Sequence, residues 1–159
     1  MSEKIKPIPE GPRAITPYLN VTGADAAIDF YKKAFGAVET IRLIGPDGRV
    51  GHAELEISGT PIMLSEEYAE MNVVSPKTLG GTPVGIHLLV EDADAVFGRA
   101  VSLGATEINP VKDQFYGERS GKLKDPFGHV WYISKRIEEM TPQEMVRRAE
   151  AWSKGEAPD

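Results

Sequence analysis

The feature that most constrains the fold is a weak internal repeat, in which Leu19 aligns with Leu88 at an offset of 69 residues. The stretch "LNVTGADA" (19–26) lies over "LLVEDADA" (88–95), and "SGTPIML" (58–64) lies over "FGHVWYI" (127–133) at the same offset. A repeat of this length predicts two copies of one supersecondary unit. Each copy is too small to close a good core alone, so we expect the two copies to pack together.

Each half predicts a strand, a helix and then three short strands. In the first half, a β-rich stretch precedes helical spacing of apolar residues over 25–35, and Gly36 suits a left-handed helix stop. The stretches "ETIRLIG" and "RVGHAELEI" around the turn "PDG" predict a hairpin. The second half repeats this order, with a helix over about 94–103 and the turn "DPFG" before its last strand. The expected fold class is therefore α+β, with two βαβββ modules.

The repeat also sets the expected boundaries. Residues 1–13 contain three prolines and predict an extended arm. Residues 14–136 form one domain made of modules 14–68 and 83–136, and residues 137–159 hold an extra amphipathic helix and a tail. Thr141, Pro142 and Glu144 have the spacing of a helix start. The apolar stripe of that helix, which includes Trp152, covers either the flank of its own domain or a second subunit.

Composition excludes several function classes. The formal net charge of −6 argues against nucleic-acid binding, which needs a basic face. The chain has no cysteine, which excludes a disulfide framework, a thiol nucleophile and a zinc–thiolate site, and which suits a cytoplasmic protein. No apolar run approaches the roughly 18 residues that a membrane-spanning helix needs. We therefore expect no nucleic-acid partner and no membrane contact.

Five motifs in order carry a resemblance to a known family: "ITPYLNV", "AIDFYKKAFGA", "GPDGRVGHAEL", "IMLSEE" and "DQFYGERSGKLKDPFGHVW". They cover roughly residues 15–135. The chain resembles the vicinal oxygen chelate superfamily, which includes glyoxalase I, bleomycin- and fosfomycin-resistance proteins and extradiol dioxygenases, and within it the PhnB-like branch. The resemblance implies a glyoxalase-like fold, in which curled mixed sheets surround a cup, and a homodimer.

The same resemblance locates four metal-ligand positions. Metal-using members offer one ligand from the first and last strand of each module, usually His, Glu, His and Glu. Here these positions fall on Thr16, Met63, Gly85 and Tyr132. Glycine has no ligating side chain, and the other three are poor ligands for a hard divalent ion. We therefore expect no cofactor and no usual metal centre. A divalent metal at a non-standard site formed by His52, Glu54 and His87 is the less favoured alternative.

Strand alternation predicts which side chains face the cup. The candidates for ligand contact or chemistry on these strands are Tyr18, His52, Glu54, Met63, His87 and Tyr132. The segment "DQFYGERSG" adds Gln114, Phe115, Glu118 and Arg119 as an expected flap, in which Phe115 forms a wall and Arg119 meets an anionic substrate. The alternative is a glycine-bent strand whose aromatic residues pack on the neighbouring module. His129 falls at a strand mouth and is expected to be a turn residue.

These observations leave three hypotheses for function. The first is a protein that binds a small molecule in a polar cup without the usual metal. The second is a metal-dependent lyase, isomerase or dioxygenase that uses the non-standard His/Glu site. The third is a non-catalytic, dimeric interaction module, which predicts an apolar and filled cup.

Overall fold

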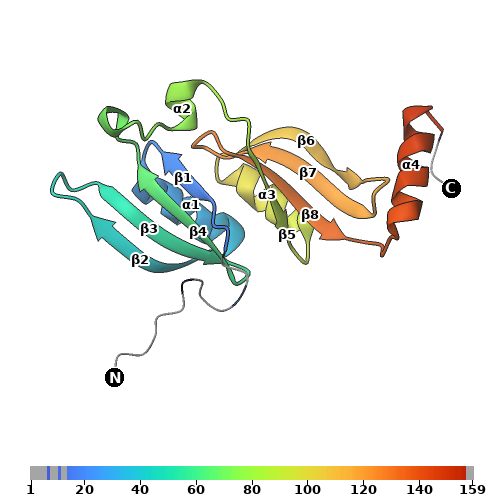
Figure 1. Ribbon diagram of the computed structural model, residues 1–159, viewed down its shortest axis with the longest axis horizontal. Helices are drawn as coiled ribbons and strands as arrows, with labels where there is room; N and C mark the ends of the chain where they lie inside the picture. Colours follow the sequence, from blue (N-terminus) through green and yellow to red (C-terminus); the bar gives the residue numbers. More distant parts are fainter. Residues whose placement is uncertain (1–6, 8–10, 12–13, 157–159) are drawn as a thin grey trace. The chain divides into compact units, whose positions relative to one another are not determined.

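The computed structural model describes residues 7, 11 and 14–156 (Figure 1). The predicted arm at 1–13 therefore lies almost entirely outside the described residues. The chain divides into two compact units, one ending at Gly81 and the other beginning at Thr82. Each unit is described by itself below. The expectation that modules 14–68 and 83–136 close into one domain stays a prediction.

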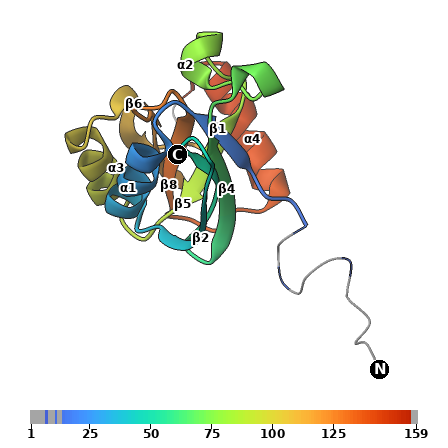
Figure 2. The same ribbon diagram turned by 90° about the vertical axis from the view of Figure 1, so that its left-hand side faces the viewer.

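The first unit holds one four-stranded sheet and one long helix. Its elements are β1 (Tyr18–Val21), α1 (Ala24–Phe35), β2 (Val38–Ile44), β3 (Val50–Ile57), β4 (Thr60–Glu66), the 3-10 helix η1 (Ala69–Met71) and the short helix α2 (Pro76–Leu79). The strand order is β1-β4-β3-β2, with β1 parallel to β4 and the other neighbours antiparallel. Figure 2 shows β1 beside β4 in this unit.

The second unit repeats this arrangement and adds a C-terminal helix. Its elements are β5 (Gly85–Leu89), α3 (Ala93–Ser102), β6 (Thr106–Asp113), β7 (Glu118–Lys124), β8 (Val130–Arg136) and α4 (Pro142–Ser153). The strand order β5-β8-β7-β6 matches that of the first unit. Tyr18 pairs with Met63, and His87 pairs with Tyr132, so both pairs keep the offset of 69. The predicted α+β class with two βαβββ modules is confirmed.

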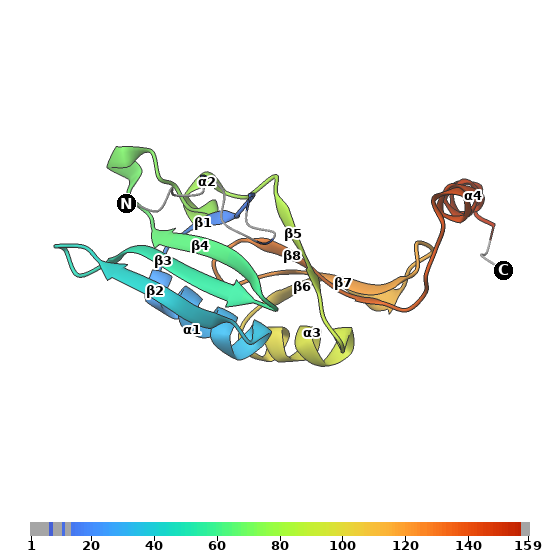
Figure 3. The same ribbon diagram turned by 60° about the horizontal axis from the view of Figure 1, so that its bottom comes forward.

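Each sheet has one face covered by a helix and one open face. In Figure 3, α1 lies along one face of the first sheet, and α3 lies along one face of the second. Ile28 and Tyr31 of α1 are fully buried, as are Leu55 and Leu64 on the sheet. Because neighbouring residues of a strand point to opposite faces, the residues between these apolar ones line the open face. The open faces are therefore where a ligand can reach the sheets.

The turn before β8 is built around a buried carboxylate. Asp125 is 3% exposed, and its side chain accepts hydrogen bonds from the backbone N–H groups of Phe127 (2.9 Å) and His129 (3.0 Å) and from Trp131 Nε1 (2.9 Å). The Asp125 carbonyl accepts from Gly128 N–H at 3.1 Å, which closes the turn. His129 is thus a turn residue, as the sequence predicts, and Asp125 has a structural role.

The C-terminal helix α4 lies on its own unit. The Thr141 side chain accepts from Glu144 N–H at 3.2 Å, which caps the helix start as predicted. Arg148 pairs with Glu138 at 2.6 Å, and Trp152 stacks on Phe115 of the β6–β7 hairpin at 5.5 Å between ring centroids. Trp152 nevertheless stays 65% exposed. Contact with a second subunit remains a prediction.

Among the described residues, no helix combines the length and apolar character needed to cross a membrane.

Candidate functional site

A row of side chains crosses the open face of the first sheet. Tyr18 on β1 pairs with Met63 on β4, and Met63 pairs with Glu54 on β3. Residues that pair across neighbouring strands have side chains on the same face. The structure therefore brings three of the predicted site residues into one row, and His52 joins them two positions along β3.

Hydrogen bonds connect Tyr18, His52 and Glu54 into one chain. Tyr18 Oη lies 2.8 Å from His52 Nδ1, and His52 Nε2 lies 3.3 Å from Glu54 Oε1. The rings of Tyr18 and His52 are tilted, with centroids 5.6 Å apart. The imidazole is thus held at both nitrogens, by groups from two different strands. This cluster has the residue types of an acid–base site.

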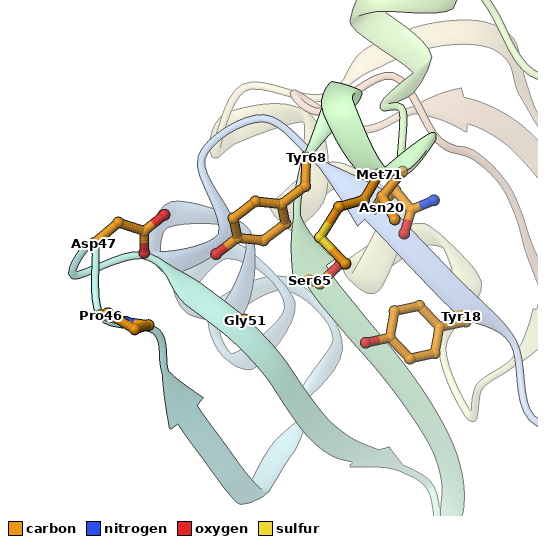
Figure 4. Close-up of a pocket in the computed structure, with 9 residues that line it drawn as sticks. Tyr18, Asn20, Pro46, Asp47, Gly51, Ser65, Tyr68 and Met71 are labelled. Carbon is orange, nitrogen blue, oxygen red and sulfur yellow. The ribbon is translucent and has the colours of Figure 1, made fainter.

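A pocket of about 850 Å³ lies next to Tyr18, the first residue of this hydrogen-bonded series (Figure 4). Of the ten candidate site residues taken from the sequence, only Tyr18 lines it. The lining residues are Tyr18, Asn20, Pro46, Asp47, Gly51, Ser65, Tyr68, Met71 and Val73. Asn20 lies two positions along β1 from Tyr18, and Ser65 lies two positions along β4 from Met63, so both share the open face, and both line the pocket. Of the three hydrogen-bonded residues Tyr18, His52 and Glu54, Tyr18 alone is among the residues that line this pocket.

The wall formed by Tyr68, Met71 and Val73 is missing from the sequence prediction. These residues follow β4, where the strand alternation ends, so no periodicity assigns them to a face. Tyr68 and Val73 exchange backbone hydrogen bonds of 2.9 and 3.1 Å, which fold this segment over the sheet. The Arg49 guanidinium lies over the Tyr68 ring, 4.2 Å from its centroid, and helps to hold the ring in place. The pocket is consequently more apolar than the strands alone predict.

The second sheet presents a different set of side chains on its open face. His87 on β5 pairs with Tyr132 on β8, and Tyr132 pairs with Lys122 on β7. His87 Nε2 lies 2.9 Å from Glu118 Oε2, and Lys122 Nζ lies 5.2 Å from the Tyr132 ring centroid. A smaller pocket of about 270 Å³ is lined by Asn109, Lys112, Gln114, Tyr116, Ser120, Gly121, Lys122 and Tyr132. Burial raises the pKa of the Tyr116 phenol.

The ring of Tyr132 lies over Gly85. A Cβ atom at position 85 would come within 2.5 Å of Tyr132 Cε2, so the tyrosine occupies the space that a side chain at 85 would need. The resemblance assigns a metal ligand to each of these two positions and to Thr16 and Met63. Gly85 offers no donor atom, and the Tyr132 ring fills the space that a side chain at position 85 would occupy. These four residues do not fit a divalent metal centre.

The residues of the non-standard metal site belong to two different units. His52 contacts Glu54 in the first unit, whereas His87 contacts Glu118 in the second. Within the part of the chain that the structure describes, no group of three or more His, Cys, Asp or Glu side chains is arranged to hold a metal ion. The site formed by His52, Glu54 and His87 therefore remains a prediction.

The predicted flap is the tip of the β6–β7 hairpin together with the start of β7. Gln114 N–H donates to the Glu118 carbonyl at 2.8 Å, and Gly117 N–H donates to the Gln114 carbonyl at 3.1 Å. Gln114 lines the smaller pocket, while Phe115 stacks on Trp152 of α4. The aromatic pair at this tip thus packs within its own unit.

Arg119 is held by two carboxylates. Its Nε and Nη2 donate to Asp94 at 2.6 and 2.8 Å, and its Nη1 donates to Asp113 at 2.8 Å. These contacts raise the pKa of Arg119, and the hydrogen bond from Arg119 lowers the pKa of Asp94. Asp94 lies in the first turn of α3, so the guanidinium faces the helix end. The role of Arg119 in binding an anionic substrate stays a prediction.

Comparison with known proteins places the chain among glyoxalase-like proteins. The sequence profile described as Glyoxalase/Bleomycin resistance protein/Dioxygenase superfamily matches residues 14–133. Protein Mb0911c of Mycobacterium bovis is 46% identical over 135 residues, which cover 83% of this chain and 89% of that protein.

Solved structures similar in fold include one from Bacillus cereus and one from Listeria monocytogenes. The PhnB protein from Bacillus cereus has a TM-score of 0.62 at 21% identity, with 77% of this chain and 99% of that chain covered. The fosfomycin resistance protein FosX from Listeria monocytogenes, solved with Mn(II) and sulfate, has a TM-score of 0.61 at 18% identity, with 87% and 98% covered. At these identities the two structures show the fold alone.

Proposed function

The chain belongs to the Glyoxalase/Bleomycin resistance protein/Dioxygenase superfamily, and from this premise we propose that it binds a small organic molecule without a resident metal. The binding site is the pocket on the open face of the first sheet. The proposal includes a place in the PhnB-like branch, a cytoplasmic location and a homodimer.

The observation that carries the proposal is the pocket itself. Its volume of about 850 Å³ lies within the range of about 300–1,000 Å³ that small-molecule sites occupy. Its lining combines apolar surface from Tyr68, Met71 and Val73 with a few polar groups on Tyr18 and Ser65. A few polar groups on an apolar wall can orient a ligand whose body is buried. An open pocket also counts against an interaction module, which predicts a filled cup.

The donor chemistry supports binding without metal. FosX was solved with Mn(II), but the inherited ligand positions in this chain hold Thr16, Met63, Gly85 and Tyr132. The Tyr132 ring further blocks the place of any ligand at position 85. Ligand binding in this proposal depends on shape and hydrogen bonding alone.

A pocket-filling variant tests the proposal. Gly51 lines the pocket, and a Cβ there meets nothing nearer than 3.8 Å, so Gly51→Phe fills the space at little cost to the backbone. We expect anilinonaphthalene sulfonate to bind the wild-type protein in the presence of a chelator and to lose at least tenfold in affinity in Gly51→Phe. The control is Gly98→Phe on α3, an exposed position with open space around it. Equal binding by all three proteins would contradict the proposal.

A further inference from the structure

The two hydrogen bonds of His52 are both satisfied when its imidazole is neutral and carries its proton on Nε2. In this tautomer Nε2 donates to the Glu54 carboxylate, which only accepts hydrogen bonds when ionised. The unprotonated Nδ1 then accepts. With this tautomer Tyr18 donates its hydroxyl proton to His52 Nδ1 over 2.8 Å. The lone pairs of the Tyr18 oxygen remain available.

The arrangement gives Tyr18 a base to receive its proton and gives that base a counter-charge. If the phenol loses its proton, His52 takes it at Nδ1, and the resulting imidazolium is paired with Glu54. A hydroxyl, an imidazole and a carboxylate connected in this order form the general logic of an activated oxygen. Here the terminal oxygen belongs to a tyrosine that lines the 850 Å³ pocket, while His52 and Glu54 are not among the lining residues.

We infer that Tyr18 is a catalytic residue for proton transfer. In this inference His52 accepts the proton of Tyr18, and Glu54 is the positioning residue of His52. A substrate in the pocket presents an acidic O–H, or a C–H beside a carbonyl, to Tyr18 Oη. The substrate X–H bond breaks as a new Oη–H bond forms, and the original Oη–H proton moves to Nδ1. The products are the substrate anion and the His52 imidazolium, so no metal or redox partner is required. Return of the proton at a different atom isomerises the substrate.

The pocket narrows the substrate class. Tyr68, Met71 and Val73 offer an apolar and aromatic wall next to the reactive phenol. This suits an organic molecule with an apolar body and one polar, weakly acidic group. The inference rests on the proposed function in one respect, since its substrate occupies the same pocket.

Reactivity of Tyr18 toward p-toluenesulfonyl fluoride tests the inference without knowledge of the substrate. In this reaction the phenolic oxygen attacks sulfur, the S–F bond breaks, fluoride leaves, and the phenol proton passes to His52. Tyr68 provides an internal comparison, because it lines the same pocket and its ring faces Arg49 instead of a histidine. We expect peptide mass spectrometry to show Tyr18 labelled at least tenfold faster than Tyr68.

Two variants separate proton acceptance from mere positioning. Glutamine in His52→Gln can hydrogen-bond the phenol but cannot take its proton, so Tyr18 labelling should fall by about a hundredfold. Glu54→Gln removes the counter-charge and should cost on the order of tenfold. Glu56→Gln, which removes the same charge one position further along that face of β3, should leave labelling unchanged.

The outcomes are distinct. Labelling of Tyr18 that is no faster than that of Tyr68, or that survives in His52→Gln, overturns the inference. Circular dichroism confirms that each variant is folded. Binding of anilinonaphthalene sulfonate, measured on the same proteins, reports separately on the proposed function. If the wild-type protein fails to bind the dye while Tyr18 is reactive, only the binding proposal is contradicted. If the wild-type protein binds the dye while Tyr18 is unreactive, only the proton-transfer inference is contradicted.

Discussion

Replacing Gly85 with alanine probes the packing that takes the place of a metal ligand. A Cβ at this position would lie 2.5 Å from Tyr132 Cε2 and 3.2 Å from Cδ2, and real carbon atoms do not approach so closely. The Tyr132 ring must therefore swing away in Gly85→Ala. It then leaves both Gly85 and the Lys122 ammonium that lies 5.2 Å from its centroid.

The change in the free energy of unfolding caused by Gly85→Ala is the sum of one favourable and two unfavourable contributions. Alanine in place of a strand glycine favours folding by roughly 0.5–1 kcal/mol, because the unfolded chain has less freedom to lose. The Tyr132 ring is 36% exposed, so displacing it costs about 1–2 kcal/mol, the lower part of the cost of overpacking, and the lost cation–π contact adds about 0.5–1 kcal/mol. We expect Gly85→Ala to lower the free energy of unfolding by about 1–2 kcal/mol. In a Tyr132→Ala background the clash is absent, and Gly85→Ala should raise the free energy of unfolding by about 0.5–1 kcal/mol.

Urea unfolding of the four proteins in this double-mutant cycle measures both values. Gly98→Ala on α3 is the control, because a Cβ there meets nothing within 4 Å. It should stabilise by about 1 kcal/mol in both backgrounds. A stabilising effect of Gly85→Ala in the wild-type background would show instead that the Tyr132 ring does not occupy the space at position 85.

Three further predictions follow from the contacts. Asp125→Ala leaves two buried donors and one part-buried donor without their acceptor and should lower the free energy of unfolding by about 3 kcal/mol in urea titrations, whereas Asp47→Ala at an exposed turn should change it by less than about 0.5 kcal/mol. Arg42 and Lys32 lower the pKa of Glu39 to about 2. The stability that ionised Glu39 gains from these two cations is therefore present above the pKa of about 4.3 that Glu39 has in the unfolded chain. It is lost as the pH falls through about 2. Calorimetry should show a shallower fall of Tm between about pH 5 and 2 in Arg42→Met, and an unchanged slope would contradict this. Arg148→Ala removes the pairing with Glu138 and Glu144 and should speed hydrogen exchange in α4 while changing global stability by less than about 1 kcal/mol; equal exchange in α4 would show that other contacts hold the helix.

Much of the fold is readable from the sequence because it depends on periodicity. The offset of 69 predicts that Tyr18 relates to Met63 as His87 relates to Tyr132, and the strand registers agree. Alternation correctly separates buried Leu55 and Leu64 from the open face, because a strand has only two faces. Helix ends are equally local, as the cap at Thr141 illustrates.

The pocket is less predictable because it depends on contacts outside the strands. Tyr68 and Met71 lie after the last strand of the first module, where the chain has no repeating pattern. The approach of Tyr132 to Gly85 is also hidden, because Gly85 pairs with Val130 and meets Tyr132 diagonally. Glu118 and Arg119 are adjacent on β7, so their side chains point to opposite faces of the sheet and cannot both face the cup.

In the proposed function this member of the superfamily binds its ligand without a resident metal. The decisive measurement is metal analysis of the purified protein, after incubation with Mn²⁺, Fe²⁺ or Zn²⁺ and removal of the free ion. We expect far less than one metal ion per chain, and equal binding of anilinonaphthalene sulfonate with and without a chelator. A stoichiometric ion that is lost in His52→Ala or His87→Ala, together with dye binding that the chelator abolishes, would contradict it.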